Sequence, residues 1–542
     1  MPSRSLGHRA PLLWVLFPLM AGLIVGRLAW LPLSPGWWAG AAVVLSGAAL
    51  GFRRAWAPCL AVGVFLSGAA FYELKRDRLP DWDALPPREL RATLHIDRMF
   101  SPRPDGKSVS GLGHIIASDT LLNELAGQSV YFSLALKRGA PPPIRSSEVS
   151  VIGVLQTLPR NPPGDTFDGY LANAGVNFRL TRAKVLATTA PATVYHRFCD
   201  AALRRFDRLL DHGIEAHPGL SGVFRAMLLG QQQDLSDEQN LMFMQSGTFH
   251  LFSISGLHIA AIAGAIYGIL MLLRLPSWGQ VLIGAVLLWL YVDITGGSPS
   301  AVRSWIMVMF LHGSRVLRVP GSPLAALVAS AFVVLILQPM QLFSASFQLS
   351  YGIVAALLLL GLPLADLWMQ RWALFGDLPK SAWRWHHHGR DWAWRSFIGM
   401  LAIGLASTLV STISGVTIFK LFTPGSLVAN LVLIPASVLV VLAGFLSLLC
   451  GLVGLSGLGL VFNYAGILVL AGIEQGVRFF VGLPGVYHAA HFSSTWLGFA
   501  ALGVVIAAIF YGYAVRWELK RGGFWPPFAL AVLALVLGVR FE

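Results

Sequence analysis

Charged residues are scarce in this chain of 542 residues. They make up 12% of it, whereas soluble proteins carry about 25%. Apolar residues fill 55% of the sequence, and the mean hydropathy is +0.65. This composition excludes an ordinary soluble enzyme and predicts a protein that crosses a membrane many times.

Cysteine and nucleotide-binding motifs are also nearly absent. The three cysteines, Cys59, Cys199 and Cys450, are far apart in the sequence, which excludes a disulfide framework and a cysteine metal site. The chain has no Gly-x-x-x-x-Gly-Lys-Ser/Thr loop and therefore no nucleotide-driven motor. The three histidines at 386–388 point in different directions on a helix, so we expect no metal there. No cofactor, ATPase or nuclease activity is expected.

Long apolar runs fill most of the chain. A span needs about 20 apolar residues, and the runs predict a polytopic α-helical membrane protein with roughly 11–13 membrane segments. The candidate spans are 11–30, 36–52, 56–72, 249–273, 278–295, 301–319, 323–337, 347–369, 397–419, 425–449, 458–481, 495–515 and 524–539.

The formal net charge is +14, and most of this excess is explained by topology. Cytoplasmic loops are enriched in Lys and Arg, so Arg4 and Arg9 predict a cytoplasmic N-terminus. The first span is long and has no clear cleavage site, which favours a retained anchor over a signal peptide. Counting the spans places the soluble segment Glu73–Thr248 and the C-terminus outside, in a multi-pass protein of the bacterial inner (cytoplasmic) membrane.

Four regions are predicted along the chain. Residues 1–72 form N-terminal membrane segments. Residues 73–192 contain alternating apolar runs separated by turn residues, which predict a small extracytoplasmic β-rich domain. Residues 193–248 are periodic at helical spacing and predict amphipathic helices at the membrane surface. Residues 249–542 form the transmembrane bundle.

The most informative motif is His250-Leu-Phe-Ser-Ile-Ser-Gly-Leu-His258, at the start of an apolar run. If it is helical, Ser255 and His258 share one face, and Gly256 begins a small-xxx-small pattern that permits close helix packing. Each residue alone has an ordinary structural explanation. The cluster as a whole favours the lining of a polar pathway, because histidine is rare on lipid-facing surfaces.

An enzyme is the alternative from another class. Ser255 beside His258 resembles the nucleophile and base of an intramembrane serine hydrolase. No third residue is present to orient the base, and no second set of oxyanion donors converges on the serine, so hydrolysis is the weaker hypothesis. A small-molecule or lipid transporter is a further alternative.

Polar residues also interrupt three later apolar runs. Asp293 and Arg303 flank a Gly-Gly-Ser-Pro turn, and we expect them to pair with each other or the arginine to meet phosphates. Gln348 lies in a polar span start. Asn430 follows Pro424 and Gly425 and precedes Pro435, a pattern that predicts a broken or re-entrant helix.

Several of these segments, in the same order, resemble the ComEC competence family. The matching elements are the Asn-Pro-Pro-Gly-Asp-Thr-Phe-Asp-Gly-Tyr-Leu segment 161–171, the Leu-Leu-Gly segment 228–230, the histidine motif 250–258, the Ser-Pro-Ser-Ala-Val-Arg segment 298–303, the Phe-Gln-Leu-Ser segment 347–350 and Asn430 with Pro435.

The resemblance implies a channel that carries single-stranded DNA across the bacterial inner membrane during natural transformation, with an OB-like soluble domain. It also implies membrane lipid, a periplasmic DNA receptor, a separate nuclease and a cytosolic DNA-pulling or DNA-binding protein as partners. Many members continue into a metallo-β-lactamase-like domain, which this sequence lacks, so transport without cleavage is expected. The predicted pore residues are His250, Ser253, Ser255, Gly256, His258, Asp293, Arg303, Gln348 and Asn430.

Overall fold

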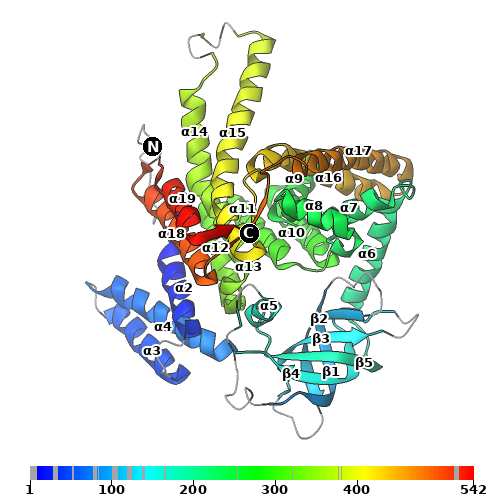
Figure 1. Cartoon of the computed structure of the whole chain (residues 1–542), viewed down its shortest axis with the longest axis vertical. Coiled ribbons are helices and arrows are strands. Elements are labelled where there is room, and N and C mark those ends of the chain that lie inside the picture. The colour runs from blue at the N-terminus through cyan, green and yellow to red at the C-terminus, as the bar shows by residue number, and fades with distance from the viewer. Residues whose placement is uncertain are drawn as a thin grey trace.

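The computed structural model of the chain contains a helical bundle and a small β-barrel (Figure 1). It describes residues 9–28, 34–51, 54–76, 82, 85–100, 108–118, 125–136, 141–160, 162–163, 166–252, 254–319, 321–375, 378–379, 381, 383–517 and 524–541.

Three helices at the N-terminus form a group beside the main bundle. They are α2 (Leu13–Leu28), α3 (Pro35–Gly51) and α4 (Trp56–Arg76). Glycines let α2 and α4 pack closely: a Cβ on Gly68 would lie 2.6 Å from the Leu19 carbonyl oxygen, and one on Gly22 would meet the Phe65 carbonyl oxygen. The group joins the bundle through the buried residues of α2.

The segment after α4 folds into a closed barrel of five strands in the order β1-β2-β3-β5-β4. The strands are β1 (Arg88–Met99), β2 (Ser108–Ser118), β3 (Ser129–Ala135), β4 (Glu148–Thr157) and β5 (Phe178–Ala190). All neighbours pair antiparallel except β3 and β5, which are parallel. This arrangement is consistent with the expected OB-like domain.

Alternation of side chains explains the barrel interior. On β1, Leu90, Ala92, Leu94 and Ile96 are almost completely buried, while the alternate residues Arg91, Thr93 and His95 are more exposed. The sequence of β2 shows only a weak strand pattern, because glycines interrupt its alternation of apolar residues. A Cβ on Gly111 would meet the Arg98 carbonyl oxygen and lie 2.7 Å from the Phe132 ring, so a larger residue does not fit there.

Residues 193–248 are helical, as expected, but they do not lie only on a surface. They form α6 (Val194–Asp211), α7 (Pro218–Leu229), η3 (Gln232–Asp234) and α8 (Asp237–Gln245). Phe224 and Leu228 of α7 are fully buried in the core of the bundle, so α7 is part of the packed interior. Asn463 Nδ2 donates to the carbonyl oxygens of Leu209 and His212, which places the end of α6 beside α17.

The remaining helices follow the predicted apolar runs closely. They are α9 (Gly256–Leu272), α10 (Ser277–Ile294), α11 (Pro299–Val316), α12 (Pro323–Leu337), α13 (Ala345–Ala356), α14 (Leu362–Arg371), α15 (Trp385–Ser414), α16 (Ser426–Leu452), α17 (Ser456–Val481), α18 (Thr495–Ala514) and α19 (Pro526–Gly538).

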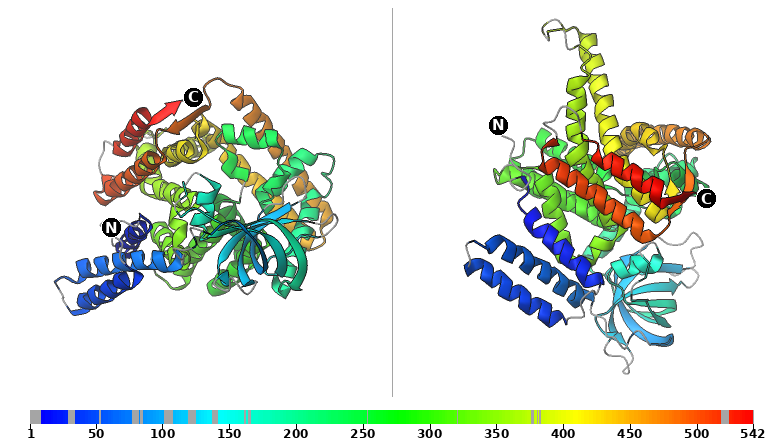
Figure 2. Two further views of the ribbon diagram at one scale, coloured as in Figure 1. Left: turned by 60° about the horizontal axis from the view of Figure 1, so that its bottom comes forward. Right: turned by 60° about the vertical axis from the view of Figure 1, so that its left-hand side comes forward.

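Seven helices of the described part are long and apolar enough to cross a membrane, by length and composition. They include one continuous helix from Ala345 to Arg371 and another from Trp385 to Phe419, each with a π-helical turn inside or at its end. The fold is therefore that of a polytopic helical membrane protein. Helices α14 and α15 form a long hairpin whose tip lies at the opposite end of the molecule from the barrel (Figures 1 and 2).

Two local expectations are wrong. The run 249–273 is not one helix: residues Phe249–Phe252 form a 3-10 turn, and α9 begins only at Gly256. His250 therefore does not lie on α9. Pro435 does not break its helix, because α16 continues through it from Ser426 to Leu452. The real interruption precedes it, at the strand β6 (Leu421–Phe422) and the turn around Pro424.

Candidate functional site

Three helices of the bundle begin in one neighbourhood, and each was predicted separately from a polar segment. A Cβ on Gly256, the first residue of α9, would lie 3.0 Å from Ser304 Oγ of α11. Arg303 of α11 contacts Ser346, the second residue of α13. A Cβ on Gly247, nine residues before α9, would lie 2.8 Å from Ser426 Cβ, where α16 begins.

The N-termini of α9, α11 and α13 therefore lie close together, and the start of α16 contacts the segment that leads into α9. We call the region of the three N-termini the N-terminal zone. Each helix N-terminus carries a partial positive charge from its aligned peptide dipoles and its unpaired N–H groups. Ser298 and Ser344 cap α11 and α13 by accepting hydrogen bonds from Ala301 N and Phe347 N. An environment of this kind favours anions.

Arg303 is the central residue of the N-terminal zone. It is 3% exposed, and its Nη2 donates to the Ser346 carbonyl oxygen at 2.8 Å and to Ser346 Oγ at 2.7 Å. Its Cζ lies 5.9 Å from the centre of the Tyr351 ring. Its Nε and Nη1 are buried without a hydrogen-bond partner, and no carboxylate lies within ion-pair distance, among the residues that the structure describes. A buried cation without a counter-ion strongly attracts a negative charge.

Asp293 does not pair with Arg303, contrary to expectation. Its carboxylate, 5% exposed, accepts a hydrogen bond from Arg145 Nη1 on the loop before β4. The Arg145 Nε also donates to the Asp97 carbonyl oxygen at 2.9 Å. Burial and a hydrogen bond to Asp293 raise the pKa of Tyr195 at the start of α6. Asp293 thus fastens the barrel to the end of α10.

A second contact fastens the barrel to the start of α13. The short helix α5 (Phe167–Asn173) packs on the barrel and is capped by Thr166, whose Oγ1 accepts a hydrogen bond from Gly169 N. Asn173 Nδ2 donates to the Phe343 carbonyl oxygen at 2.9 Å, and Asn173 Oδ1 accepts from Arg27 Nη1 at 2.8 Å. The two attachments hold the barrel against the N-terminal zone.

The barrel and α5 carry four aromatic rings, Phe100, Tyr131, Phe167 and Tyr170, which we call the aromatic patch. Each ring contacts two others, with centroids 5.2 to 6.2 Å apart. Phe167 is 49% and Tyr170 is 40% exposed. Phe100 is three residues from Asp97 and Tyr170 three from Asn173, so the patch is close in sequence to both attachments.

Two arginines accompany the aromatic patch. Arg98 Cζ lies 5.7 Å from the centre of Phe100, and Arg179 Cζ lies 5.4 Å from the centre of Phe167. Arg179 also forms an ion pair with Asp168. Exposed rings with guanidinium groups stack well on nucleobases and attract phosphates. This patch was not predicted from the sequence, because Phe100, Tyr131 and Phe167 are distant in sequence and only the Phe-Asp-Gly-Tyr segment gave a signal.

The histidine motif is divided by the start of α9. Ser255 is the N-cap residue, and its backbone N donates a hydrogen bond to His258 Nδ1 at 3.3 Å. His258 is 1% exposed. Because Nδ1 already accepts a hydrogen bond, this nitrogen is engaged in capping the helix and is not directed at the Ser255 hydroxyl as a base. The serine hydrolase alternative gains no support from this geometry.

The other predicted residues occupy different positions in the same region. His250 is exposed, although its neighbours Leu251 and Phe252 are buried in the core. Gln348 Nε2 donates to the Leu342 carbonyl oxygen, and Gln348 Oε1 has no partner among the described residues. Asn430 Oδ1 on α16 is likewise unpaired within the described part of the chain. Ser253 lies outside the described residues.

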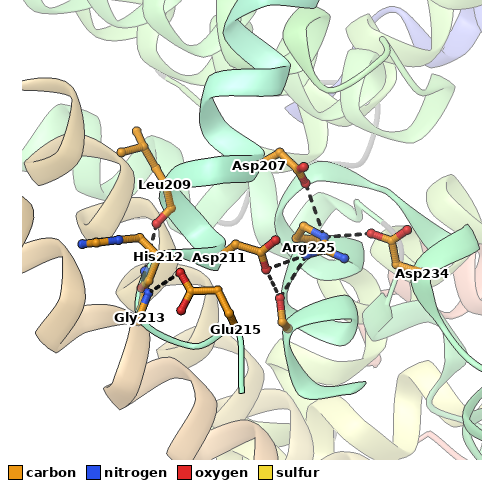
Figure 3. A network of polar contacts seen from close by, with 10 residues as sticks. Asp207, Leu209, Asp211, His212, Gly213, Glu215, Arg225 and Asp234 are labelled. Atoms are coloured by element: carbon orange, nitrogen blue, oxygen red, sulfur yellow. Dashed lines mark hydrogen bonds and ion pairs between the residues drawn. The ribbon is translucent and has the colours of Figure 1, made fainter. Parts of the chain in front are cut away.

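A compact charge network lies in the helical segment 193–248, before the N-terminal zone in the chain (Figure 3). Arg225 of α7 bonds to Asp234 at 2.8 Å and to Asp211 at 2.6 Å, and it contacts Asp207 at 3.3 Å. Burial raises the pKa of Asp207, although Arg225 opposes this effect. The network joins α6, α7 and η3 and so holds the segment that leads into the N-terminal zone.

Fold and site together define a helical membrane protein whose β-barrel is held over a cluster of helix N-termini. A family model described as "Competence protein" matches residues 227–515, just over half of the chain. The chain belongs to this competence protein family. The matched region includes α9 to α18 and therefore the whole N-terminal zone.

The chain is 32% identical over 144 residues to ComE operon protein 3 of Bacillus subtilis (strain 168). The match spans 26% of this chain and only 18% of the relative's length. No solved structure matches the chain.

Proposed function

We propose that this protein forms the path by which a single DNA strand crosses the bacterial inner membrane during natural transformation. Arg303 carries the proposal: it is a buried guanidinium with spare donors and no carboxylate partner among the described residues, and it lies where α9, α11 and α13 begin. Membership in the competence family supports DNA as the cargo.

The electrostatics of the N-terminal zone suit a phosphate chain. Each phosphate carries a full negative charge, and burying it in hydrocarbon without compensation is prohibitively costly. Arg303 and the three helix N-termini supply fixed positive charge in a water-poor region. The dipoles are partial charges, and among the described residues of the zone one guanidinium is buried, so each phosphate is held weakly and the strand can move on.

The barrel also supports the proposal. The aromatic patch offers rings on which bases stack, and base–aromatic stacking contributes about 1–3 kcal/mol per base without sequence preference. The attachments at Asp293 and Asn173 hold this patch beside the N-terminal zone. A strand bound to the patch is therefore delivered to Arg303.

The proposed orientation places the barrel outside the inner membrane and the tip of the α14–α15 hairpin inside. The arginines and lysine between Arg371 and Arg395 support a cytoplasmic tip. In this arrangement a periplasmic receptor and a separate nuclease would supply the strand on the barrel side, and a cytosolic DNA-pulling or DNA-binding protein would receive it at the opposite side.

Transformation by Arg303 variants tests the proposal. In a transformable host with its own gene deleted, Arg303→Gln should lower DNA uptake by about tenfold or more, because a charge-assisted hydrogen bond contributes roughly 1.5–3 kcal/mol. Arg303→Lys keeps the charge but loses the planar donors. Its DNA uptake should therefore lie between that of the wild type and that of Arg303→Gln.

Arg315→Gln is the matched control, because Arg315 is exposed at the other end of α11. Equal amounts of each variant in the membrane must be verified by quantitative blotting. Wild-type uptake by Arg303→Gln, or an equal loss in Arg315→Gln, would contradict the proposal.

A further inference from the structure

An apolar groove of about 650 Å³ lies between α2 on one side and α12, α13 and α18 on the others. It adjoins the N-terminal zone at Gln348 and Tyr351 of α13, which also line the groove. Its rim includes Phe17 and Ile24 of α2 and Trp496 of α18, which are 44%, 42% and 73% exposed, so the groove opens toward the outside of the bundle.

The groove is apolar along most of its length and polar at one end. Arg27 lies at the barrel-side end, where its Nη1 donates to Asn173 and its Cζ lies 4.3 Å from the centre of the Phe343 ring. No carboxylate pairs with Arg27 among the described residues. Gln348 also lines the groove, and its buried Oε1 lacks a hydrogen-bond partner there.

The length of the groove matches one lipid rather than a passage through the membrane. The lining on α2 runs from Leu13 to Arg27, which corresponds to about 21 Å along a helix. The hydrocarbon core of a bilayer is about 30 Å thick, so one leaflet supplies about 15 Å. Near the other end Phe17 contacts Phe510 edge-to-face, with ring centroids 5.4 Å apart.

From these observations we infer that the groove binds one phospholipid of the barrel-side leaflet. Its acyl chains lie along α2, and its phosphate lies at the Arg27 guanidinium. A hydroxyl or ammonium of the head group donates to Gln348 Oε1. Charge complementarity selects this occupant: an apolar helix of a partner would leave Arg27 without an anion, whereas a phospholipid supplies both an anion and apolar chains.

Two variants separate the contribution of the head group from that of the chains. Arg27→Gln removes the cation, and Arg9→Gln is its control, because Arg9 lies beyond the other end of α2 with its Cζ 5.2 Å from the Tyr513 ring centre. Gly503→Leu fills the groove, since a Cβ on Gly503 has no atom within 4 Å. Gly472→Leu is its control on an equally open surface of α17.

Native mass spectrometry of the purified full-length protein measures the bound lipid. Phosphatidylglycerol and a diacylglycerol with the same chains are added in parallel. We expect Arg27→Gln to reduce phosphatidylglycerol binding by about fivefold, the scale of one basic residue near a lipid surface, and to leave diacylglycerol binding unchanged. Gly503→Leu should reduce both, and the two controls should match the wild type.

Three outcomes would overturn the inference. They are a wild-type protein that retains no phospholipid, equal losses in the control variants, or a groove occupied by a second copy of the chain, seen as a dimer that Gly503→Leu dissociates. Circular dichroism of each variant verifies that it is folded. The result is independent of DNA uptake, so it can fail while the proposed path stands.

Discussion

Arg145 of the barrel forms an ion pair with Asp293 at the end of α10, across 148 residues of sequence. The two partners are not equally buried: the Arg145 side chain is 37% exposed, and the Asp293 side chain is 5% exposed. The attachment of the barrel to the bundle therefore depends on an asymmetric pair.

This asymmetry predicts unequal effects of mutation. Arg145→Gln leaves a buried carboxylate without its cation and should destabilise the protein by roughly 1–3 kcal/mol. Asp293→Asn leaves the partly exposed Arg145 cation, whose side chain can reorient and be hydrated. This variant should therefore reduce the stability by less. Thermal unfolding in detergent measures both. Arg204→Gln, which removes an exposed pair with Asp200 on α6, is the control and should change little. Equal losses at Arg145 and Asp293 would argue against the asymmetry.

The same attachment should weaken in acid. His196 lies near Arg145, Asp293 and His95, and burial, with the charge of Arg145, lowers its pKa below the usual 6.5. A histidine whose pKa is lower in the folded protein than in the unfolded chain binds its proton less readily when folded. Its contribution to stability is therefore complete above the unfolded pKa and is lost as the pH falls through the folded pKa. Stability should therefore decline below about pH 6.5.

His196→Gln cannot take up a proton and should remove that part of the pH dependence. Thermal unfolding of the wild type and the variant between pH 5 and 8 tests this. His212, exposed at the end of α6, provides the control substitution His212→Gln. Parallel pH profiles for wild type and His196→Gln would exclude His196 as the responsible group.

The aromatic patch should bind single strands by stacking. Phe167→Ala and Tyr170→Ala should each weaken binding of an oligonucleotide to the full-length protein in nanodiscs by about 1 kcal/mol or more. Arg179→Gln should also reduce the dependence of affinity on salt, because it removes a phosphate contact. Fluorescence anisotropy measures both. Leu186→Ala, at an exposed apolar site on β5, should have no effect; a comparable loss there would indicate general damage to the barrel.

The contact between α6 and α17 predicts a topological relationship. Asn463 bonds to Leu209 and His212, so the α6–α7 turn and the α16–α17 turn must lie on the same side of the membrane. Single cysteines at Glu215 and Gly454, in a protein without its three native cysteines, should react with an impermeant maleimide from the same side.

Labelling from opposite sides would show that the two turns are separated in the membrane. Cysteines at Ser129 in the barrel and Trp385 in the hairpin mark the two ends of the molecule. They should react from opposite sides, because the barrel and the hairpin tip lie at opposite ends (Figure 1).

Hydropathy predicted most of the fold because membrane spans are local features. The apolar runs match α2 to α4 and α9 to α19 within a few residues at most ends, although α15 begins 12 residues earlier, at Trp385, and carries polar residues there. β2 was not recognised, since its pattern is interrupted by glycines that the close approach of Arg98 requires.

The site was predicted as a set of separate segments but not as a set of contacts. Polar residues at span starts correctly indicated where helices begin, because serine caps and buried polar side chains leave a local signal. Pairing is a tertiary property, and it was predicted incorrectly: Asp293 is close to Arg303 in sequence but binds Arg145. The role of Asn173, which joins α5 to Phe343 and Arg27, had no local signal at all.

The helix from Trp385 to Phe419 has one further consequence. Its 35 residues extend about 52 Å, whereas the hydrocarbon core of a bilayer is about 30 Å thick. It therefore exceeds the hydrocarbon core by roughly 20 Å, and the proposed orientation puts this excess at the hairpin tip, on the side away from the barrel. The opposite end of the helix is the π-helical turn Gly415–Phe419, only a few residues before Ser426, which lies against Gly247. We therefore predict that a force applied at the tip is transmitted along the continuous helix to the start of α16.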